Sequence, residues 1–389
     1  MIYLDHAATS PLRPSAAAAL RAAYDGPLGN PSGAHTAARR AKGLLEEARE
    51  RVAARCGVGP AAVTFTSGGT EADNLAVKGV VRAARSVARR DPTVVVSAVE
   101  HKAVLAPADR VAAEGVRVLR APVTTEGVVD LDRLADLLDE RVVLVSVMQV
   151  NNETGVIQPL DDVAVIVRER APRAVLHTDA VQGAVWCDPA AACRLADLVS
   201  LSAHKLGGPV GVGALVAGGP VGLHPEIEGG GQERGLRAGT PAAPGALAFA
   251  AALDEALATR AGDLARLEAL RDRLEAGLLG ACPGAWVNGA GAARVAGITN
   301  VGLPGVEAEP LVAMLDAAGL AAATGAACRS GASESSHVLE AMGHDTAAAR
   351  SCLRLSLGWT TNDAEIDTAL ERIPALAADL ARGLAAPVP

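Results

Sequence analysis

The chain passes from a short apolar run into a glycine-rich loop at Leu198-Val199-Ser200-Leu201-Ser202-Ala203-His204-Lys205-Leu206-Gly207-Gly208-Pro209. The apolar run predicts a buried strand, and Lys205 lies where that strand ends. Desolvation at such a place favours a neutral amine, which can condense with the carbonyl group of an aldehyde cofactor. Ser202 and His204 beside it can hold an anionic group such as a phosphate. A surface lysine in a turn is the ordinary alternative, because most lysines are exposed, so the interpretation depends on the rest of the chain.

Short β-branched runs alternate with helical stretches over the first half of the chain. The runs lie at residues 63–66, 93–97, 116–119, 142–147, 174–177 and 198–201. Between them, apolar residues recur at helical spacing, as at Leu131, Leu134 and Leu138. Such alternation implies crossover connections between strands. It predicts an α/β fold whose central sheet is mostly parallel and covered by helices on both faces.

The pattern changes after about residue 245. A long helix rich in Ala, Leu and Arg is expected over residues 246–279, followed by strands near 297–302 and 353–357 with helices around them. No low-complexity linker separates the two parts. We therefore expect a large domain over residues 1–245 and a smaller α+β domain over residues 246–389.

The composition excludes several classes of function. The formal net charge is −8 and the basic residues are scattered, so the chain offers no basic stripe for a nucleic acid. No apolar run reaches the length of a membrane span or of a signal peptide, which predicts a cytoplasmic protein without a membrane partner. The 6 cysteines lie far apart without a Cys-x-x-Cys pair, so neither a metal site nor a disulfide framework is expected.

Polar motifs follow several of the predicted strands, where open parallel sheets place their ligand crevices. Gly69 and Thr70 open a helix, and its backbone N–H groups and the Thr70 hydroxyl can cradle a phosphate. His101 can stack on a flat ring or move a proton. A buried Asp179 needs a cationic partner, which a protonated pyridine nitrogen supplies. Each motif alone has an ordinary alternative, such as a capped helix or a structural histidine.

Taken together, these motifs resemble those of pyridoxal-phosphate enzymes of fold type I, and most closely the cysteine desulfurases of the NifS/IscS type, which are class-V aminotransferase-like. The resemblance runs essentially end to end. It rests on Asp179 with Gln182, the Ser202-Ala203-His204-Lys205 segment, Gly68-Gly69-Thr70, Gly229-Gly230-Gly231-Gln232-Glu233-Arg234-Gly235-Leu236-Arg237-Ala238-Gly239-Thr240, Tyr3-Leu4-Asp5-His6-Ala7-Ala8-Thr9, Gly29-Asn30-Pro31-Ser32 and residues 65–79, 145–159 and 351–358.

The resemblance implies a role for each matching residue. Lys205 would form the Schiff base with the cofactor pyridoxal 5'-phosphate, and Asp179 would pair with the ring nitrogen. The other cofactor contacts implied are His101 stacked over the ring, Gln182 and Asn152 at the ring and its phenolic oxygen, and Gly69, Thr70, Ser202 and His204 at the phosphate. Thr240 would reach the phosphate of the neighbouring subunit, which implies a homodimer. Asn30 and Arg354 would hold the substrate carboxylate.

Cys328 matches the sulfur-accepting cysteine of this family. It lies in a run of small and polar residues, 325–336, which predicts an exposed, mobile loop. A thiol on such a loop could collect sulfur at the cofactor and deliver it outside. Ala326, Arg329 and Ser335 depart from the residues that the family commonly has here, which bears on the loop's conformation more than on the chemistry.

The resemblance implies a cysteine desulfurase that converts L-cysteine to L-alanine and leaves a persulfide on Cys328 for an acceptor protein. A selenocysteine lyase or an aminotransferase would share the cofactor site, but a transaminase has no need of Cys328. A non-catalytic sulfur-relay partner would tolerate the loss of Lys205 or Asp179, and both are present. The acceptor stays open among iron–sulfur cluster assembly, tRNA thiolation, DNA sulfur modification and a biosynthetic sulfur carrier.

Overall fold

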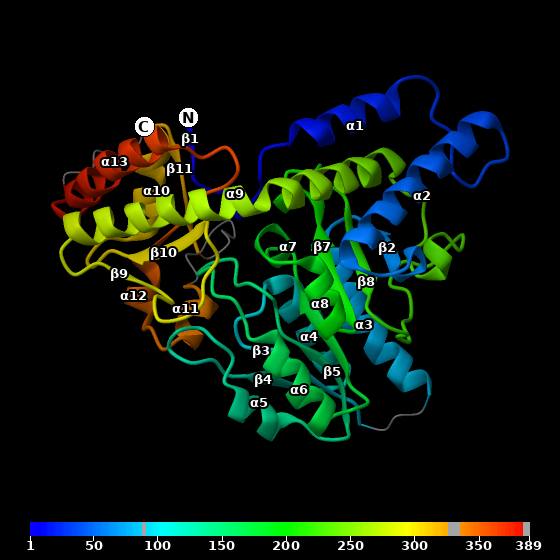
Figure 1. Ribbon diagram of the computed structural model, residues 1–389. Coiled ribbons are helices and arrows are strands. Elements are labelled where there is room, and N and C mark those ends of the chain that lie inside the picture. The colour runs from blue at the N-terminus through cyan, green and yellow to red at the C-terminus, as the bar shows by residue number, and fades with distance from the viewer. Residues whose placement is uncertain (88–90, 326–334, 384–389) are drawn as a thin grey trace.

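The computed structural model describes residues 1–87, 91–325 and 335–383. Its main feature is a central sheet with helices on both faces, to which the C-terminal part of the chain is attached at one end (Figure 1). A long helix, α9 (Ala243–Ala281), runs along both parts. In the part of the chain that the structure describes, no helix is both long and apolar enough to cross a membrane.

The central sheet has 7 strands in the order β2-β8-β7-β6-β5-β3-β4. Its strands from β3 to β7 pair in parallel, whereas β8 pairs antiparallel with both β7 and β2. The bounds are β2 (Val63–Thr66), β3 (Thr93–Ser97), β4 (Arg117–Ala121), β5 (Val142–Ser146), β6 (Val175–Asp179), β7 (Leu198–Ser202) and β8 (Gly213–Ala217). The mostly parallel sheet confirms the expected fold class. Only β8 has no counterpart among the expected strands.

Helices cover the sheet on both faces because its strands carry apolar side chains on both sides. One core joins the sheet to α3 (Gly69–Ser86) and α4 (Lys102–Ala113). A second core joins the opposite face to the first half of α9 and to α2 (Thr36–Cys56), α5 (Leu131–Leu137), α6 (Leu160–Arg170) and α8 (Pro189–Leu195). The short helix α7 (Gly183–Trp186) follows β6, and α1 (Pro14–Tyr24) packs against α9. Each strand end at the carboxyl side is therefore held from both faces.

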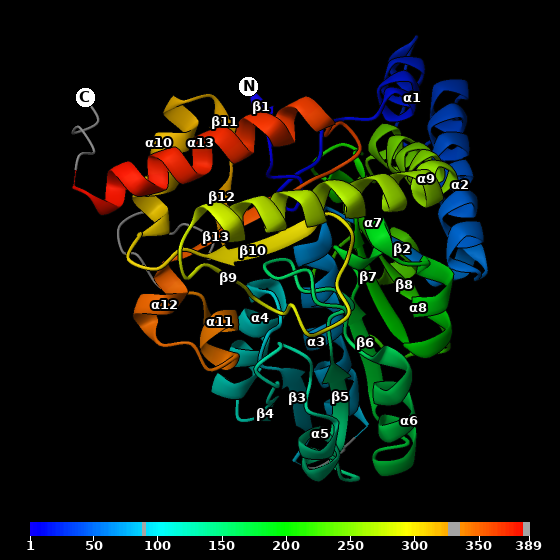
Figure 2. The same ribbon diagram turned by 60° about the vertical axis from the view of Figure 1, so that its left-hand side comes forward.

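The C-terminal part is built on an antiparallel sheet of order β12-β13-β10-β9. Its strands are β9 (Trp286–Val287), β10 (Ile298–Gly302), β12 (Ala323–Thr324) and β13 (Cys352–Ser356), and its helices are α10 (Ala308–Ala317), α11 (His337–Ala341), α12 (Thr346–Arg350) and α13 (Asp363–Ala381). The N-terminal strand β1 (Ile2–Tyr3) pairs in parallel with β11 (Leu320–Ala321). Figure 2 shows α13 beside the second half of α9.

Helix α9 contributes to a core in each part. Phe249 and Leu253 in its first half pack into the core of the central sheet, whereas Leu267 and Leu274 in its second half pack against the C-terminal sheet. The helix crosses residue 245 without a break, so the division into residues 1–245 and 246–389 stays a prediction.

A buried ion pair fixes the glycine-rich loop that precedes α9. Both Nη atoms of Arg49 on α2 lie 2.8 Å from the carboxylate oxygens of Glu233, and Glu233 Oε2 also accepts from the Phe65 N–H at 2.9 Å. Each charged group inside a protein needs such a partner, because desolvation is costly. The pair therefore holds this loop against α2 and β2, a few residues before Thr240.

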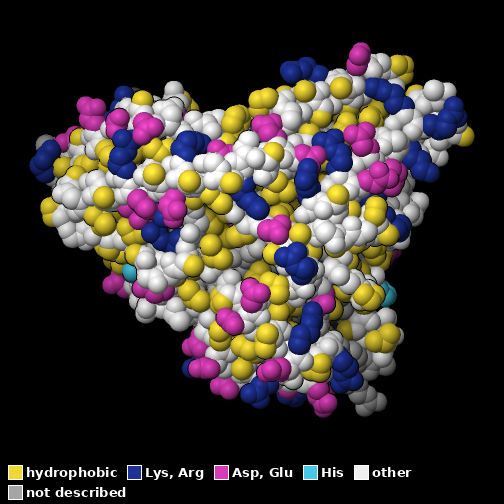
Figure 3. Space-filling model, in the orientation of Figure 1, with side chains coloured by type: hydrophobic (Ala, Val, Ile, Leu, Met, Phe, Trp, Pro, Cys, Tyr) yellow, Lys and Arg dark blue, Asp and Glu magenta, His cyan; other side chains and the backbone are white. Residues whose placement is uncertain are grey.

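Charged side chains of both signs are interspersed on the face shown in Figure 3, without a continuous basic stripe. The distribution over this face agrees with the net charge of −8.

Candidate active site

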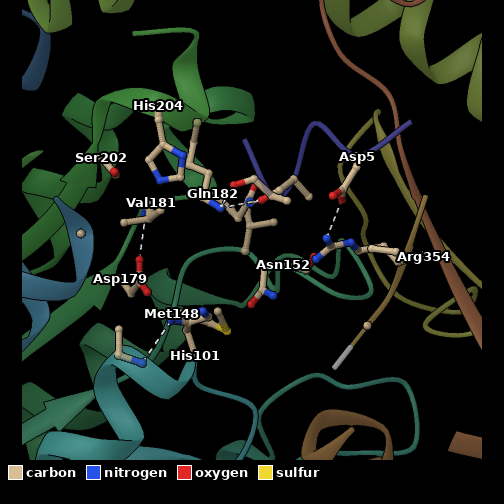
Figure 4. Close-up of a pocket in the computed structure, with 18 of the residues that line it drawn as sticks. Asp5, His101, Met148, Asn152, Asp179, Val181, Gln182, Ser202, His204 and Arg354 are labelled. Atoms are coloured by element: carbon tan, nitrogen blue, oxygen red, sulfur yellow. Dashed lines mark hydrogen bonds and ion pairs between the residues drawn. The ribbon is translucent and has the colours of Figure 1, made fainter. Parts of the chain in front are cut away.

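A cavity of about 560 Å³ lies at the carboxyl ends of the parallel strands, where the C-terminal part meets the sheet. Its lining includes most of the residues that the sequence predicts for the site, namely Gly69, Thr70, His101, Asn152, Asp179, Gln182, Ser202, His204, Lys205 and Arg354 (Figure 4). They come from the carboxyl ends of β6 and β7, from the segments that follow β2, β3, β5, β6 and β7, and from β13. The fold thus brings together residues as far apart in the sequence as Gly69 and Arg354.

Other predicted site residues lie elsewhere. Asn30 and Thr240 are absent from the lining of this cavity, and they lie together, with Asn30 Nδ2 3.4 Å from Thr240 Oγ1. One chain therefore does not bring Asn30 and Arg354 to the same cavity. Cys328 lies outside the described residues. Gly325, however, contributes to the wall of the cavity, and Cys328 follows it by only a few positions in the sequence.

One end of the cavity is suited to a phosphate. The helix α3 begins at Gly69, which lies so close to the neighbouring loop that an added Cβ would be 2.5 Å from Val181 Cγ2. This close approach brings the N-terminus of α3 to Ser202. The first N–H groups of a helix lack partners within the helix and attract anions. The buried Ser202 Oγ has no hydrogen-bond partner among the described residues, so it can donate to a ligand.

Asp179 is the last residue of β6 and is buried. Its Oδ1 accepts from the Val181 N–H at 2.9 Å, as the dashed line in Figure 4 shows. Burial raises the pKa of the Asp179 carboxyl, and the nearby His101 and Lys205 oppose this rise. A cationic ring nitrogen placed against Asp179 would stabilise the ionised form further. The site therefore fits a protonated pyridine.

Lys205 lies in the short helical turn Ala203–Leu206 that follows β7. Its Nζ donates to the backbone carbonyls of Ala7 at 2.6 Å and Ala8 at 2.8 Å. Burial and the charge of Arg354 lower the pKa of Lys205 to about 8. At pH 7 about a tenth of the amine is then neutral, which is far more than at the ordinary lysine pKa, and a neutral amine is the form that attacks an aldehyde or removes a proton.

Arg354 enters the cavity from β13 opposite Lys205. Its Nη2 lies 2.7 Å from Asp5 Oδ1, and its Nη1 donates to the Asn152 carbonyl at 3.1 Å (Figure 4). Its Nε is buried without a partner among the described residues. A guanidinium that is held in this way and retains a donor is suited to a substrate carboxylate. Asp5 was not assigned a role from the sequence, because only its place in the Tyr3-Leu4-Asp5-His6 block hints at it.

His101 precedes α4 and caps it. Its Nδ1 accepts from the Ala103 N–H at 3.1 Å, which leaves Nε2 to carry the ring proton in the neutral form. Burial lowers the pKa of His101, so the neutral ring is favoured. A flat, neutral imidazole beside Asp179 can stack on an aromatic ring and exchange a proton through Nε2.

A buried polar network behind Asp179 was not foreseen from the sequence. His177, two residues earlier on β6, bonds Ser146 Oγ at 2.9 Å and Ser200 Oγ at 3.0 Å, and its Nε2 lies 3.6 Å from Asp73 Oδ1. Burial lowers the pKa of His177 to about 3, so the ring is neutral. Burial, and then the charge of Asp179, raise the pKa of Asp73. The network therefore supports β6 without adding a second charge beside Asp179.

The pKa of Lys205 gives a test on the cofactor-free protein. We expect the rate at which it condenses with pyridoxal 5'-phosphate to rise with pH and to level off above about 8, because only the neutral amine attacks. Arg354→Leu removes a charge that lowers this pKa and should move the profile to higher pH, whereas Asp5→Asn should move it to lower pH. The measurement is stopped-flow absorbance. Shifts of the same sign in both variants would contradict this electrostatic account.

Comparison with known proteins identifies the family of this chain. The family model described as Aminotransferase class-V matches residues 2–369. The IscS-like cysteine desulfurase of Mycobacterium tuberculosis is 42% identical over 380 residues, which cover 96% of this chain and 95% of that protein. A cysteine desulfurase of Cereibacter sphaeroides is 41% identical over 375 residues, with 96% and 95% covered. A solved NifS-like protein superposes with a TM-score of 0.90 at 34% identity, over 97% of this chain and 100% of that chain.

These likenesses extend over nearly the whole chain, so the expected fold type is confirmed. The chain belongs to the class-V aminotransferase family, within its cysteine desulfurases of the NifS/IscS type.

Proposed function

We propose that this protein is a pyridoxal-phosphate-dependent cysteine desulfurase, which converts L-cysteine to L-alanine and takes the sulfur onto Cys328 as a persulfide. One observation carries the proposal: a buried carboxylate, a lysine of lowered pKa and an arginine with a buried free donor line the same cavity as Gly325. Because an extended chain advances by about 3.3–3.6 Å per residue, Cys328 is within reach of that cavity from Gly325.

The residues present fit the cofactor. Ser202 Oγ, His204 and the N-terminus of α3 would hold the phosphate, and Asp179 would hold the protonated ring nitrogen. When bound through Lys205, pyridoxal phosphate supplies an electron sink for the substrate's α-carbon. This cofactor assignment is supported by the match of residues 2–369 to the class-V aminotransferase family.

The chain's own residues then have distinct tasks. Arg354 holds the substrate carboxylate through its free donor, and Asp5 and the Asn152 carbonyl hold Arg354. Lys205, released as a neutral amine, removes the α-proton. The Cys328 thiolate attacks the substrate sulfur, so a sulfur–sulfur bond forms as the carbon–sulfur bond breaks. The electron pair of the broken bond stays on the substrate's β-carbon, and protonation there yields the methyl group. Return of the proton from Lys205 to the α-carbon completes L-alanine.

Thr240 and Asn30 lie together and outside the cavity lining. We propose that the protein is a homodimer in which Thr240 reaches the phosphate of the partner subunit. Because Asn30 is hydrogen-bonded to Thr240, it belongs to the same neighbouring site. The substrate carboxylate would then be held by Arg354 of one subunit and by an asparagine of the other. A sulfur-acceptor protein and a location in the cytoplasm complete the proposal.

The role of Cys328 is tested by Cys328→Ser. This variant should keep the cofactor and still bind L-cysteine, because those steps use Lys205 and Arg354. It should form no persulfide and release no alanine, since a serine oxygen does not accept the sulfur. Cys282→Ser is the matched control, because Cys282 is a free, partly exposed cysteine that does not line the cavity, and it should keep full turnover. Normal alanine formation by Cys328→Ser would favour a lyase or a transaminase instead.

The shared site is tested with mixed dimers of Lys205→Ala and Asn30→Ala. Each variant alone should be inactive or weak. In a mixed dimer, the subunit that keeps Lys205 receives an intact Asn30 from its partner. One of the dimer's two sites is then complete, so about half of the wild-type activity should return. A mixed dimer as inactive as its parents would show that Asn30 acts within its own subunit. Light scattering of the same samples establishes whether dimers are present.

A further inference from the structure

Glu153 is a buried acidic residue to which the proposed chemistry gives no task. It follows Asn152 in the loop after β5, and only 4% of it is exposed. Its Oε2 accepts a hydrogen bond of 2.5 Å from Ser336 Oγ. Ser336 is also the cap of α11, since its Oγ accepts from the Leu339 N–H at 3.2 Å. The carboxyl group of Glu153 thus bonds the residue at which the chain enters α11.

The same oxygen lies against the other end of the Cys328 segment. An added Cβ on Gly325 would overlap Glu153 Oε2, and it would lie 3.2 Å from Glu153 Cδ. The chain at Gly325 therefore runs directly over the carboxyl group, which would have to shift to admit a Cβ at this position. In sequence, Cys328 lies between Gly325 and Ser336, so a single side chain contacts the described residues on both sides of it.

Glu153 is itself firmly placed. Its backbone N–H donates to Asn151 Oδ1 at 2.9 Å, and its carbonyl accepts from Asn300 Nδ2 at 3.3 Å. Asn300 lies opposite Arg354 in the pairing of β10 with β13. The loop that holds Glu153 also provides the Asn152 carbonyl that binds Arg354. Both ends of the Cys328 segment are thereby connected, through Glu153 and its loop, to Arg354 at the substrate site.

Burial of a carboxyl group is costly unless it is hydrogen-bonded, and an apolar residue of similar size would avoid that cost. Burial raises the pKa of Glu153, whereas the bond from Ser336 lowers it. The group is retained between Gly325 and Ser336, where an apolar side chain would fill the space but could not accept the Ser336 hydrogen bond. The hydrogen bond from Ser336, rather than packing alone, therefore explains why a glutamate is present at position 153.

We propose that Glu153 is a positioning residue that holds the flanks of the Cys328 segment, Gly325 and Ser336, in register with Arg354. The proposal rests on the proposed role of Cys328 as sulfur acceptor. It assigns to Glu153 no contact with the substrate and no proton transfer. Its consequence is that the thiol's approach to the substrate sulfur depends on a hydrogen bond outside the cavity's reacting groups.

The test compares Glu153→Ala with Glu153→Gln. Alanine removes the acceptor for Ser336, whereas glutamine keeps an acceptor oxygen at nearly the same place. Because small displacements of reacting groups cost about 100-fold in rate, we expect Glu153→Ala to slow persulfide formation on Cys328 by about that factor. Cofactor absorbance and the affinity for L-cysteine should stay at the wild-type level. Glu153→Gln should recover most of the rate.

A second measurement does not depend on catalysis. Trypsin can cleave after Arg329, which lies between the two flanks in sequence. Loss of a buried hydrogen bond is worth about 1–3 kcal/mol, so Glu153→Ala should raise the rate of this cleavage by about 5- to 150-fold, and Glu153→Gln should not. The matched control is Glu340→Ala, because Glu340 accepts a hydrogen bond from Ser335, the residue before Ser336, at an exposed site. It should leave both rates unchanged.

The outcomes separate the two proposals. If the wild-type protein forms no alanine from L-cysteine, the proposed function is wrong, while the cleavage rates still test whether Glu153 holds the flanks of the Cys328 segment. If Glu153→Ala keeps the wild-type rates of persulfide formation and of cleavage, the proposed positioning role of Glu153 is wrong. If Glu153→Ala fails to fold, Gly325→Ala decides, because it leaves Glu153 intact and only crowds the contact. If that variant forms the persulfide slowly but keeps the wild-type melting temperature, the positioning role of Glu153 is supported. A wild-type rate of persulfide formation would overturn it.

Discussion

Burial of the Asp179 carboxylate without a complete ionic partner is the constraint on which the site depends. The described residues give it one backbone hydrogen bond, and burial raises its pKa. The surrounding network avoids further charge, because the nearby His177 is neutral and burial favours the protonated form of Asp73. A carboxylate in such a place has a strong preference for a cationic ligand. A protonated pyridine ring fits that preference, and the phosphate cradle fixes the ring's orientation.

The parallel sheet provides only part of the site. It aligns the carboxyl ends of β5, β6 and β7, at or after which lie Asn152, Asp179 and Lys205. The N-terminal segment completes the cavity, since the carbonyls of residues 7 and 8 bind Lys205 and Asp5 binds Arg354 of β13. The pairing of β1 with β11 brings the N-terminal segment there. The substrate side and the cofactor side thus both depend on contacts with the N-terminal segment.

The sequence was sufficient for the strands whose side chains are apolar and β-branched. Residues 63–66 and 93–97 are β2 and β3 as expected, because both faces of these strands are buried. The strand β8 was missed because its Gly213-Ala214-Leu215-Val216-Ala217 run has little β-branched character, and its pairing with β7 and β2 supplies what propensity does not.

Several motif residues of the cavity could be singled out because they end or follow a strand, whereas the roles of others, such as Arg354 within β13, were implied by the family resemblance. Asp5, Asp73, His177 and Glu153 were assigned no role, because their partners lie far away in the sequence. The pairing of Asn30 with Thr240 is of the same kind. Cys328 lies outside the described residues, so its proximity to the cavity is inferred from Gly325, which lines the cavity.

The protonation state of the bound cofactor's ring nitrogen tests the central claim most directly. It is measured by nuclear magnetic resonance on protein loaded with pyridoxal phosphate that carries ¹⁵N in its ring. We expect a protonated nitrogen in the wild-type protein near neutral pH, because the Asp179 carboxylate stabilises it. In Asp179→Asn, which has a similar size but no charge, the proton should be lost and deuterium exchange at the substrate's α-carbon should slow. An unprotonated nitrogen in the wild-type protein, or an unchanged resonance in the variant, would contradict the account.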